Sequence, residues 1–213
     1  LGGEGSTTGD VFFNAGGLLA VDGSNGTTAF GANGDFDTSA GLGVRVDTAP
    51  TAPGPFTVVD YGTWTNTAGI ADLSVAAGGF QASGRGAGAT FTDTSTSITL
   101  DLGYLNNTWQ GTDGANPTLW DIGTTGNWSN TTDALFYNGD FVTFDDTATT
   151  KNVVITGANV APTSVIFSNT TGNDYTLGSA GSETLSTAHG IQFNGTGDVT
   201  INSVIAGSGA LNQ

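Results

Sequence analysis

Few side chains in this sequence carry the chemistry that catalysis needs. The chain has a single histidine, His189, and no cysteine, so the count excludes the His and Cys clusters that bind zinc. A serine-type triad would require His189 beside a hydroxyl group and an acid. Ser186 and Thr187 are close in sequence, but serine, threonine and aspartate are abundant throughout the chain. We therefore expect His189 to be a loop residue without a catalytic role.

The acidic residues are the most numerous group with binding potential. The chain has 19 acids, of which only Glu4 and Glu183 are glutamates. Calcium takes oxygen ligands from Asp, Asn and backbone carbonyls. Two clusters contain the candidate calcium ligands, which are Asp35, Asp37, Asp140 and Asp145.

Neither cluster matches an EF-hand or the Gly-rich nonapeptide of calcium-binding β-rolls. Asp145 and Asp146 are adjacent, so on a strand their side chains point to opposite faces and at most one joins a given site. We expect solvated turn aspartates and no cofactor, with calcium at these positions as the alternative.

Enzymes that act on polysaccharides require groups that this sequence does not bring together. A lyase for an acidic polymer needs cations, and Arg45, Arg85 and Lys151 are far apart in sequence. A glycosidase needs two carboxylates flanking the sugar, and nothing in the sequence selects a pair. We expect that the protein is not an enzyme, and a β-helix polysaccharide-active enzyme ranks last among our hypotheses.

Three tryptophans, Trp109, Trp120 and Trp128, lie close together in the second half of the chain. Indole rings can stack on sugars, so glycan contact is one interpretation of these residues. The other is a hydrophobic core, since each aromatic side chain buries a large area. We favour the core interpretation.

Composition predicts an all-β protein. Of 213 residues 35 are glycine, and the helix-forming residues Glu, Lys, Arg and Met are almost missing. The remaining residues favour strands and turns. With three cations and a net charge of −16, the chain is unsuited to nucleic acid, which binds through Lys and Arg. No apolar run reaches the length of a membrane span.

Short strands and turn signals alternate along the sequence. The Asn-Gly pairs at 25–26, 33–34, 138–139 and 194–195 predict tight turns. Prolines at 50, 53 and 55 predict a loop before Phe56. The predicted strands are 10–13, 18–22, 43–47, 56–61, 71–76, 89–92, 97–102, 141–145, 152–156, 164–167, 174–177, 190–194, 198–202 and 203–205.

An internal repeat is the strongest organising signal. Residues 191–202 align without gaps with residues 11–22, and the weaker copies begin at Val142 and Val165. Val142, Val165 and Ile191 lie 23 and 26 residues apart, about one coil of a β-solenoid. The repeat predicts an all-β fold built as a β-solenoid or as tandem β-sandwich-like halves.

We expect two regions, residues 1–105 and 106–213, and no polar cap at either end of the chain. A stack of β-coils without caps must bury its last apolar strands against something. We expect copies to add strands to one another, so that residues 10–22 of one copy complete the sheet containing residues 190–202 of the next. The expected assembly residues are Val11, Phe13, Leu19, Val21, Ile191, Phe193, Val199 and Ile201.

Residues 109–213 carry a recognisable order of motifs. Trp109-Gln110-Gly111, Leu119-Trp120-Asp121 and Gly126-Asn127-Trp128-Ser129 are followed by blocks at 138–148, 160–167 and 205–211. Residues 56–61 and 97–102 look like the closing part of a preceding unit. This order resembles the autotransporter-associated β-strand repeat proteins, which are large surface proteins of bacteria such as Verrucomicrobia and Planctomycetes.

The resemblance implies a secreted, repetitive surface protein without catalytic residues. We therefore expect a structural subunit of an extracellular filament, sheath or cell-surface matrix, whose partners are copies of itself. The alternative is an adhesin or passenger segment that binds cell-surface glycans and does not polymerise.

Overall fold

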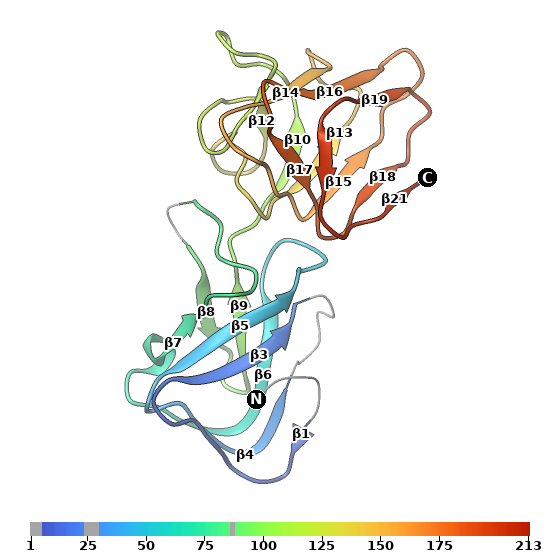
Figure 1. Ribbon diagram of the computed structural model, residues 1–213. Helices are drawn as coiled ribbons and strands as arrows, with labels where there is room; N and C mark the ends of the chain where they lie inside the picture. Colours follow the sequence, from blue (N-terminus) through green and yellow to red (C-terminus); the bar gives the residue numbers. More distant parts are fainter. Residues whose placement is uncertain (1–5, 24–29, 86–87) are drawn as a thin grey trace. The chain divides into compact units, whose positions relative to one another are not determined.

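The computed structural model describes residues 6–23, 30–85 and 88–213 (Figure 1). All regular elements in these ranges are strands, apart from a 3-10 turn, η1 (Gly69–Asp72). The predicted all-β class is therefore confirmed. No helix in the described ranges is long and apolar enough to cross a membrane. The chain divides into two compact units, residues 1–103 and 104–213, close to the predicted boundary after residue 105.

The second unit contains three sheets whose strands run mostly parallel. Sheet I contains β12 (Trp128–Ser129), β10 (Asn106–Trp109), β13 (Phe141–Phe144), β15 (Ser164–Phe167), β18 (Ile191–Phe193) and β21 (Leu211–Asn212). Sheet II contains β11 (Leu119–Trp120), β14 (Asn152–Ile155), β16 (Tyr175–Ser179) and β19 (Val199–Ile201). Sheet III pairs β17 (Thr184–Ser186) with β20 (Val204–Ala206). Only β12 is antiparallel to its neighbour.

Apart from β12 and β13, which both belong to sheet I, consecutive strands of this unit belong to different sheets. The chain passes from β15 in sheet I to β16 in sheet II and β17 in sheet III, and then returns to sheet I at β18. We call one such passage a circuit. Val142 pairs with Val165, and Val165 pairs with Ile191. The three residues whose spacing marked the repeat therefore lie side by side on neighbouring parallel strands.

Aromatic rings form the core of the second unit. Phe144 lies 4.8 Å from Phe167 at an interplanar angle of 14°, and Phe167 lies 5.6 Å from Phe193 at 7°. Parallel pairing in register causes this stacking, because it places the equivalent residue of each circuit directly beside the previous one. Tyr175 and the tryptophans pack around the stack.

The first unit has a related arrangement of two sheets. Sheet IV contains β1 (Ser6–Thr7), β2 (Val11–Phe12), β4 (Gly31–Asp37), β6 (Phe56–Thr65), β9 (Ser97–Asp101) and β8 (Thr90–Asp93). Sheet V contains β3 (Gly17–Asp22), β5 (Leu42–Thr48) and β7 (Leu73–Val75), all parallel. From β2 to β7 the chain alternates between the two sheets, and only β9 and β8 add antiparallel pairs.

The repeat that aligned residues 11–22 with residues 191–202 corresponds to a shared local structure. β2 and β3 form a strand, a turn and a strand that lead from one sheet to the next, and β18 and β19 do the same. Phe13 packs on Phe36 with the ring centroids 5.7 Å apart. Phe193 also packs on a ring of a neighbouring circuit, but it stacks on Phe167 at an interplanar angle of 7°, whereas Phe13 meets Phe36 edge to face at 75°.

The structure differs from the predicted turns at one Asn-Gly pair. Residues 33 and 34 lie inside β4, where its pairing with β6 shifts in register between Ala32 and Asp35. A Cβ at Gly34 would lie 2.5 Å from Oδ1 of Asp10, so glycine permits a close approach there and makes no turn. Gly139 has the positive φ of a turn, +96°. The pair at 25–26 lies outside the described residues.

The stacked aromatic core predicts that truncating Phe144 lowers the stability of the second unit. Phe144 is fully buried between Phe167, Tyr175 and the tryptophans. Phe144→Ala should destabilise the second unit by about 3–5 kcal/mol, because it removes the ring and leaves a cavity. Urea unfolding followed by tryptophan fluorescence measures this, since three of the four tryptophans lie beside Phe144. Ile70→Ala is the control: Ile70 is 45% exposed and its truncation should cost less than about 0.5 kcal/mol. Equal costs for the two variants would contradict the stacked core.

Candidate functional site

The predicted calcium ligands of the first unit serve as hydrogen-bond acceptors for nearby residues. The carboxylate of Asp35 accepts a bond from Thr65 Oγ1 at 2.8 Å, and that of Asp37 accepts one from the Ser39 N–H at 2.8 Å. Across residues 6–23, 30–85 and 88–213, no group of three or more His, Cys, Asp or Glu is placed to bind a metal ion. The four predicted aspartates therefore do not form such a group in these ranges.

Asp140 has a structural environment of its own. It is fully buried and accepts hydrogen bonds from the Leu105 N–H (2.9 Å), Asn107 Nδ2 (2.6 Å) and the Tyr137 N–H (2.9 Å). Burial, together with the nearby Asp140 charge, raises the pKa of Tyr104 to about 12. Asp140 thus ties the first strand of the second unit to the turn before β13. Asp145 accepts a separate bond from the Thr147 N–H at 2.9 Å.

The three tryptophans lie in the core of the second unit. Trp109 and Trp120 are fully buried and Trp128 is 2% exposed. Trp128 contacts Trp109 and Trp120 edge to face, with centroids 5.0 and 5.2 Å apart. Trp109 Nε1 also donates to the Thr150 carbonyl at 2.6 Å. The rings present no accessible face on which a sugar could stack.

His189 lies in the turn that leads into β18. Its backbone N–H donates to the Thr163 carbonyl at 2.8 Å, which ties this turn to the previous circuit. This backbone contact is the kind expected for a loop residue.

A different set of polar contacts recurs in both units. A side-chain oxygen of Asp or Asn accepts the backbone N–H of a residue about one circuit later in the chain, and we call this contact a bracket. The Asp10–Asp35 bracket measures 2.8 Å, Asn159–Thr184 2.9 Å and Asp174–Asp198 3.0 Å. Two more join Asn138 to Ala161 at 2.8 Å and Asp146 to Thr170 at 2.7 Å.

The brackets follow the strand register. Asp174 directly precedes Tyr175, whose partner is Val199, and Asp198 directly precedes Val199. Asn159 and Thr184 flank the Val160–Leu185 bridge in the same way, and Asp10 and Asp35 flank the Val11–Phe36 pair. Sequence reasoning missed this role. A usable signal was present, because Asp or Asn stands just before an apolar strand residue at intervals of one circuit.

In the described part of the chain, no strand pairs with the outer edges of the last circuit of the second unit. β19, β20 and β21 are the terminal strands of sheets II, III and I. Val204 is 61% exposed, Ile205 38% and Leu211 60%. These three side chains and the edges of the three strands form a surface that we call the C face.

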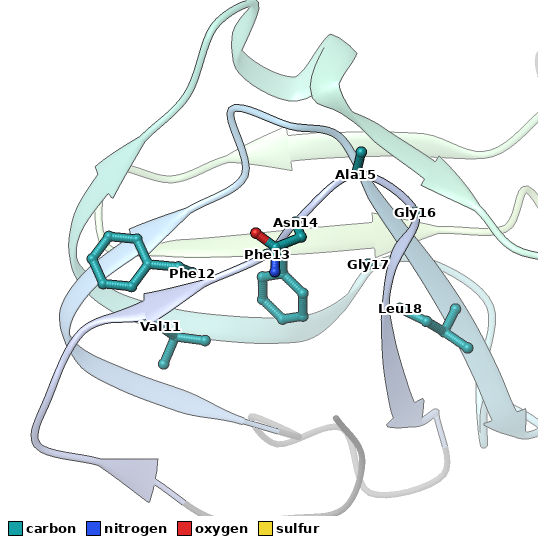
Figure 2. A pocket seen from close by; sticks show the side chains of 8 residues that line it. All are labelled: Val11, Phe12, Phe13, Asn14, Ala15, Gly16, Gly17 and Leu18. Atoms are coloured by element: carbon teal, nitrogen blue, oxygen red, sulfur yellow. The ribbon is translucent and has the colours of Figure 1, made fainter.

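The first described circuit of the first unit has an exposed aromatic side chain and a hollow near it. β3 is the terminal strand of sheet V, and Phe12 is 64% exposed. A hollow of about 420 Å³ is lined by residues 11–18. Figure 2 shows this segment running from β2 through the turn at Ala15 and Gly16 into β3, with Phe12 and Phe13 leaving it in different directions. We call the hollow and the exposed side chain of Phe12 the N face.

The structure separates the expected assembly residues into two groups. Val11 and Phe13 line the hollow of the N face. Leu19 and Val21 are buried on the terminal strand β3, and Val199 and Ile201 are half-buried on the terminal strand β19.

Ile191 and Phe193 do not belong to an open edge. Ile191 is 1% exposed, and its strand β18 pairs with β15 on one side and β21 on the other. The expectation that residues 10–22 of another copy complete the sheet at residues 190–202 is therefore wrong for β18, because β21 of the same chain already pairs there. Among the residues that the structure describes, β19 is the part of that segment with no strand paired at its second edge.

Comparisons with protein-family models, with curated proteins and with solved structures found no match to this chain.

The Asp146 bracket predicts a dependence of stability on pH. Thr170 donates to Asp146 from Oγ1 at 2.6 Å and from its N–H at 2.7 Å. These bonds, with a smaller contribution from the Lys151 charge, lower the pKa of Asp146 below its ordinary value of 3.8. A carboxylate with a lowered folded-state pKa stabilises the fold above its unfolded pKa, and this contribution is lost as the pH falls through the folded-state pKa.

Asp146→Ala should therefore lower the melting temperature at pH 7, and the difference from the wild type should narrow as the pH falls below 3.8. Thermal melts over this pH range measure it. In a Thr170→Val background the same substitution should cost less, because one of the two donors is already missing. A difference that stays constant across the pH range, or is unchanged by Thr170→Val, would rule out this bracket.

Proposed function

We propose that this chain is a structural segment of an extracellular surface protein, in which the circuits form a β-solenoid and copies join through their open strand edges. It would build a filament, sheath or matrix at the cell surface. Its partners in this role are other copies of the same chain.

The strand pairing supports the solenoid part of the proposal. In the second unit four parallel pairs follow one another in sheet I and three in sheet II, and each pair joins strands one circuit apart. Each circuit buries its aromatic residue only because the next circuit lies on it. Such dependence on neighbouring repeats is typical of solenoids, and it supports this part of the proposal.

The C face is the observation that carries the proposal. Open strand edges present unpaired N–H and C=O groups, which readily pair with another chain. At the C face these edges coincide with three exposed apolar side chains, Val204, Ile205 and Leu211. An apolar surface with pairing groups along it favours the addition of a further β-strand.

Composition and motif order support the extracellular location. The chain has no cysteine and a net charge of −16, which suits a soluble and heavily hydrated surface. The blocks from Trp109 to Leu211 resemble repeat proteins of bacterial surfaces. Brackets and stacked rings stabilise such a chain without disulfides.

Sedimentation velocity and negative-stain electron microscopy over a concentration series test the proposal. The wild type should form linear assemblies as the concentration rises. The double variant Val204→Asp/Leu211→Asp should raise the dissociation constant at least about a hundredfold, because it removes two apolar contacts and places two carboxylates in the interface.

Ile70→Asp is the matched control, since Ile70 is also an exposed apolar residue but lies on η1 and outside both faces. It should assemble like the wild type. Circular dichroism confirms that each variant folds. A wild type that remains a single monomeric species at all concentrations would refute the proposed function.

A further inference from the structure

Three chemically reactive groups meet where strands β10 and β13 end. The two strands pair in parallel, with Thr108 beside Thr143. Gln110 follows the first strand and Asp145 follows the second, so these two residues lie at the same level. Thr147 donates from Oγ1 to Asp145 Oδ1 at 2.5 Å, and Gln110 Nε2 donates to the same hydroxyl oxygen at 3.0 Å. A carboxylate, a hydroxyl and a primary amide therefore form one chain of hydrogen bonds.

These groups have the chemistry of an acyl transfer. The carboxylate of Asp145 is a general base for the hydroxyl of Thr147, which then becomes a nucleophile. The 3.0 Å hydrogen bond and an amide C–N bond of about 1.33 Å place Cδ of Gln110 within about 4.3 Å of the hydroxyl oxygen. A shift of the Gln110 side chain by roughly 1 Å brings this carbon to the distance of a near-attack conformer.

Hydrogen bonds to the backbone hold the two partners in place. The N–H of Gln110 donates to the Asn127 carbonyl at 2.8 Å, and the Gln110 carbonyl accepts the Thr149 N–H at 2.8 Å. On the other side, the N–H of Thr147 donates to Asp145 Oδ1 at 2.9 Å. Because both partners are already positioned in the fold, little conformational entropy is lost when they react.

A positive charge lies in the same loop as the nucleophile. Lys151 is the only lysine of the chain. Its Nζ donates to the Ala148 carbonyl at 2.8 Å and lies 3.5 Å from the Asp146 carbonyl, and these two residues flank Thr147. The ammonium favours the negative charge that develops on an amide oxygen when a nucleophile attacks the amide carbon.

We propose that Thr147 and Gln110 react to form an ester cross-link within one chain. Oγ1 of Thr147 attacks Cδ of Gln110, and the bond between Cδ and Nε2 breaks. The hydroxyl proton passes through the Asp145 carboxylate to Nε2, so ammonia leaves and the carboxylate is restored. No atom is oxidised or reduced, and the step needs no co-reactant.

The cross-link joins two neighbouring strands of sheet I covalently. Its ends lie 37 residues apart in the sequence, so it restricts the unfolded chain as a disulfide of that span does. The chain has no cysteine, and an ester supplies such a restriction without redox chemistry. The reaction takes place inside a single chain, and it therefore does not depend on the proposed assembly.

Mass spectrometry of the intact, purified chain tests the cross-link. The wild type should be lighter than its sequence by the mass of one ammonia molecule. After protease digestion, the peptides that contain Gln110 and Thr147 should appear as one linked species. Mild alkali should separate them, because it hydrolyses esters much faster than amides.

Two variants remove the reacting groups one at a time. Thr147→Val lacks the nucleophile, and Gln110→Glu lacks the nitrogen that leaves as ammonia. Each should have the full mass of its sequence, and circular dichroism confirms that each folds. A wild type with the full mass of its sequence would overturn the inference. A loss of ammonia that persists in Thr147→Val would also overturn it, because the ammonia then leaves from another site.

Thr170→Val is the matched control. Thr170 Oγ1 also donates to a carboxylate, that of Asp146 at 2.6 Å, and it accepts from the Asn173 amide, but at 3.2 Å. This variant should lose ammonia as the wild type does. If it keeps the full mass of its sequence, the reacting hydroxyl is that of Thr170 and the inference is wrong.

The role of Asp145 has its own test. Asp145→Asn keeps the shape of the side chain without the basic carboxylate, so it should slow the loss of ammonia at least about tenfold. A time course of intact masses from the moment of purification measures this rate. If Asp145→Asn reacts as fast as the wild type, Asp145 is not the base.

Discussion

Parallel pairing in register is the constraint on which the rest of this structure depends. When each strand lies beside its equivalent from the previous circuit, every residue lies beside a residue in the same position of the repeat. Positions that face inward must therefore be apolar in each circuit, and large rings at these positions stack, as Phe144, Phe167 and Phe193 do. The same pairing has no natural end, because the last strand of each sheet always leaves one edge without a partner.

The register also explains how an acidic chain tolerates aspartates one circuit apart. Asp174 and Asp198, like Asp10 and Asp35, occupy equivalent positions in adjacent circuits, where like charges repel. In each pair the first carboxylate accepts the backbone N–H of the second residue, so a hydrogen bond to a charged group offsets the repulsion. It also satisfies a backbone donor at the point where the chain turns into a strand. The aspartates of these pairs thus serve as acceptors in the turns, and in the described ranges no three acids come together as a group that could hold a metal ion.

Much of the fold can be predicted from the sequence, and the rest cannot for identifiable reasons. The spacing of Val142, Val165 and Ile191 is visible because apolar strand residues repeat at one-circuit intervals. The pair Asn33-Gly34 misleads, since its turn propensity is overridden by the close approach of Asp10 to β4. β11 and β12 were not predicted because each has only two residues, and the tryptophans of β10, β11 and β12 indicate a core without indicating strands. The brackets cannot be predicted from local sequence patterns, because the two partners of each bracket lie about one circuit apart in the sequence.

The terminal strands β19, β20 and β21 lack the residues that commonly protect the edge of a sheet. Natural sheets protect terminal strands with lysine, proline, bulges or covering loops. The chain has three cationic residues, Arg45, Arg85 and Lys151, and none of them lies on β19, β20 or β21. No proline lies on these strands either, and apolar side chains stand exposed along two of them. A terminal circuit with this composition continues the pattern of the circuits before it. The backbone hydrogen bonds and apolar contacts that join β16 to β19 are therefore also open to a further strand beside β19.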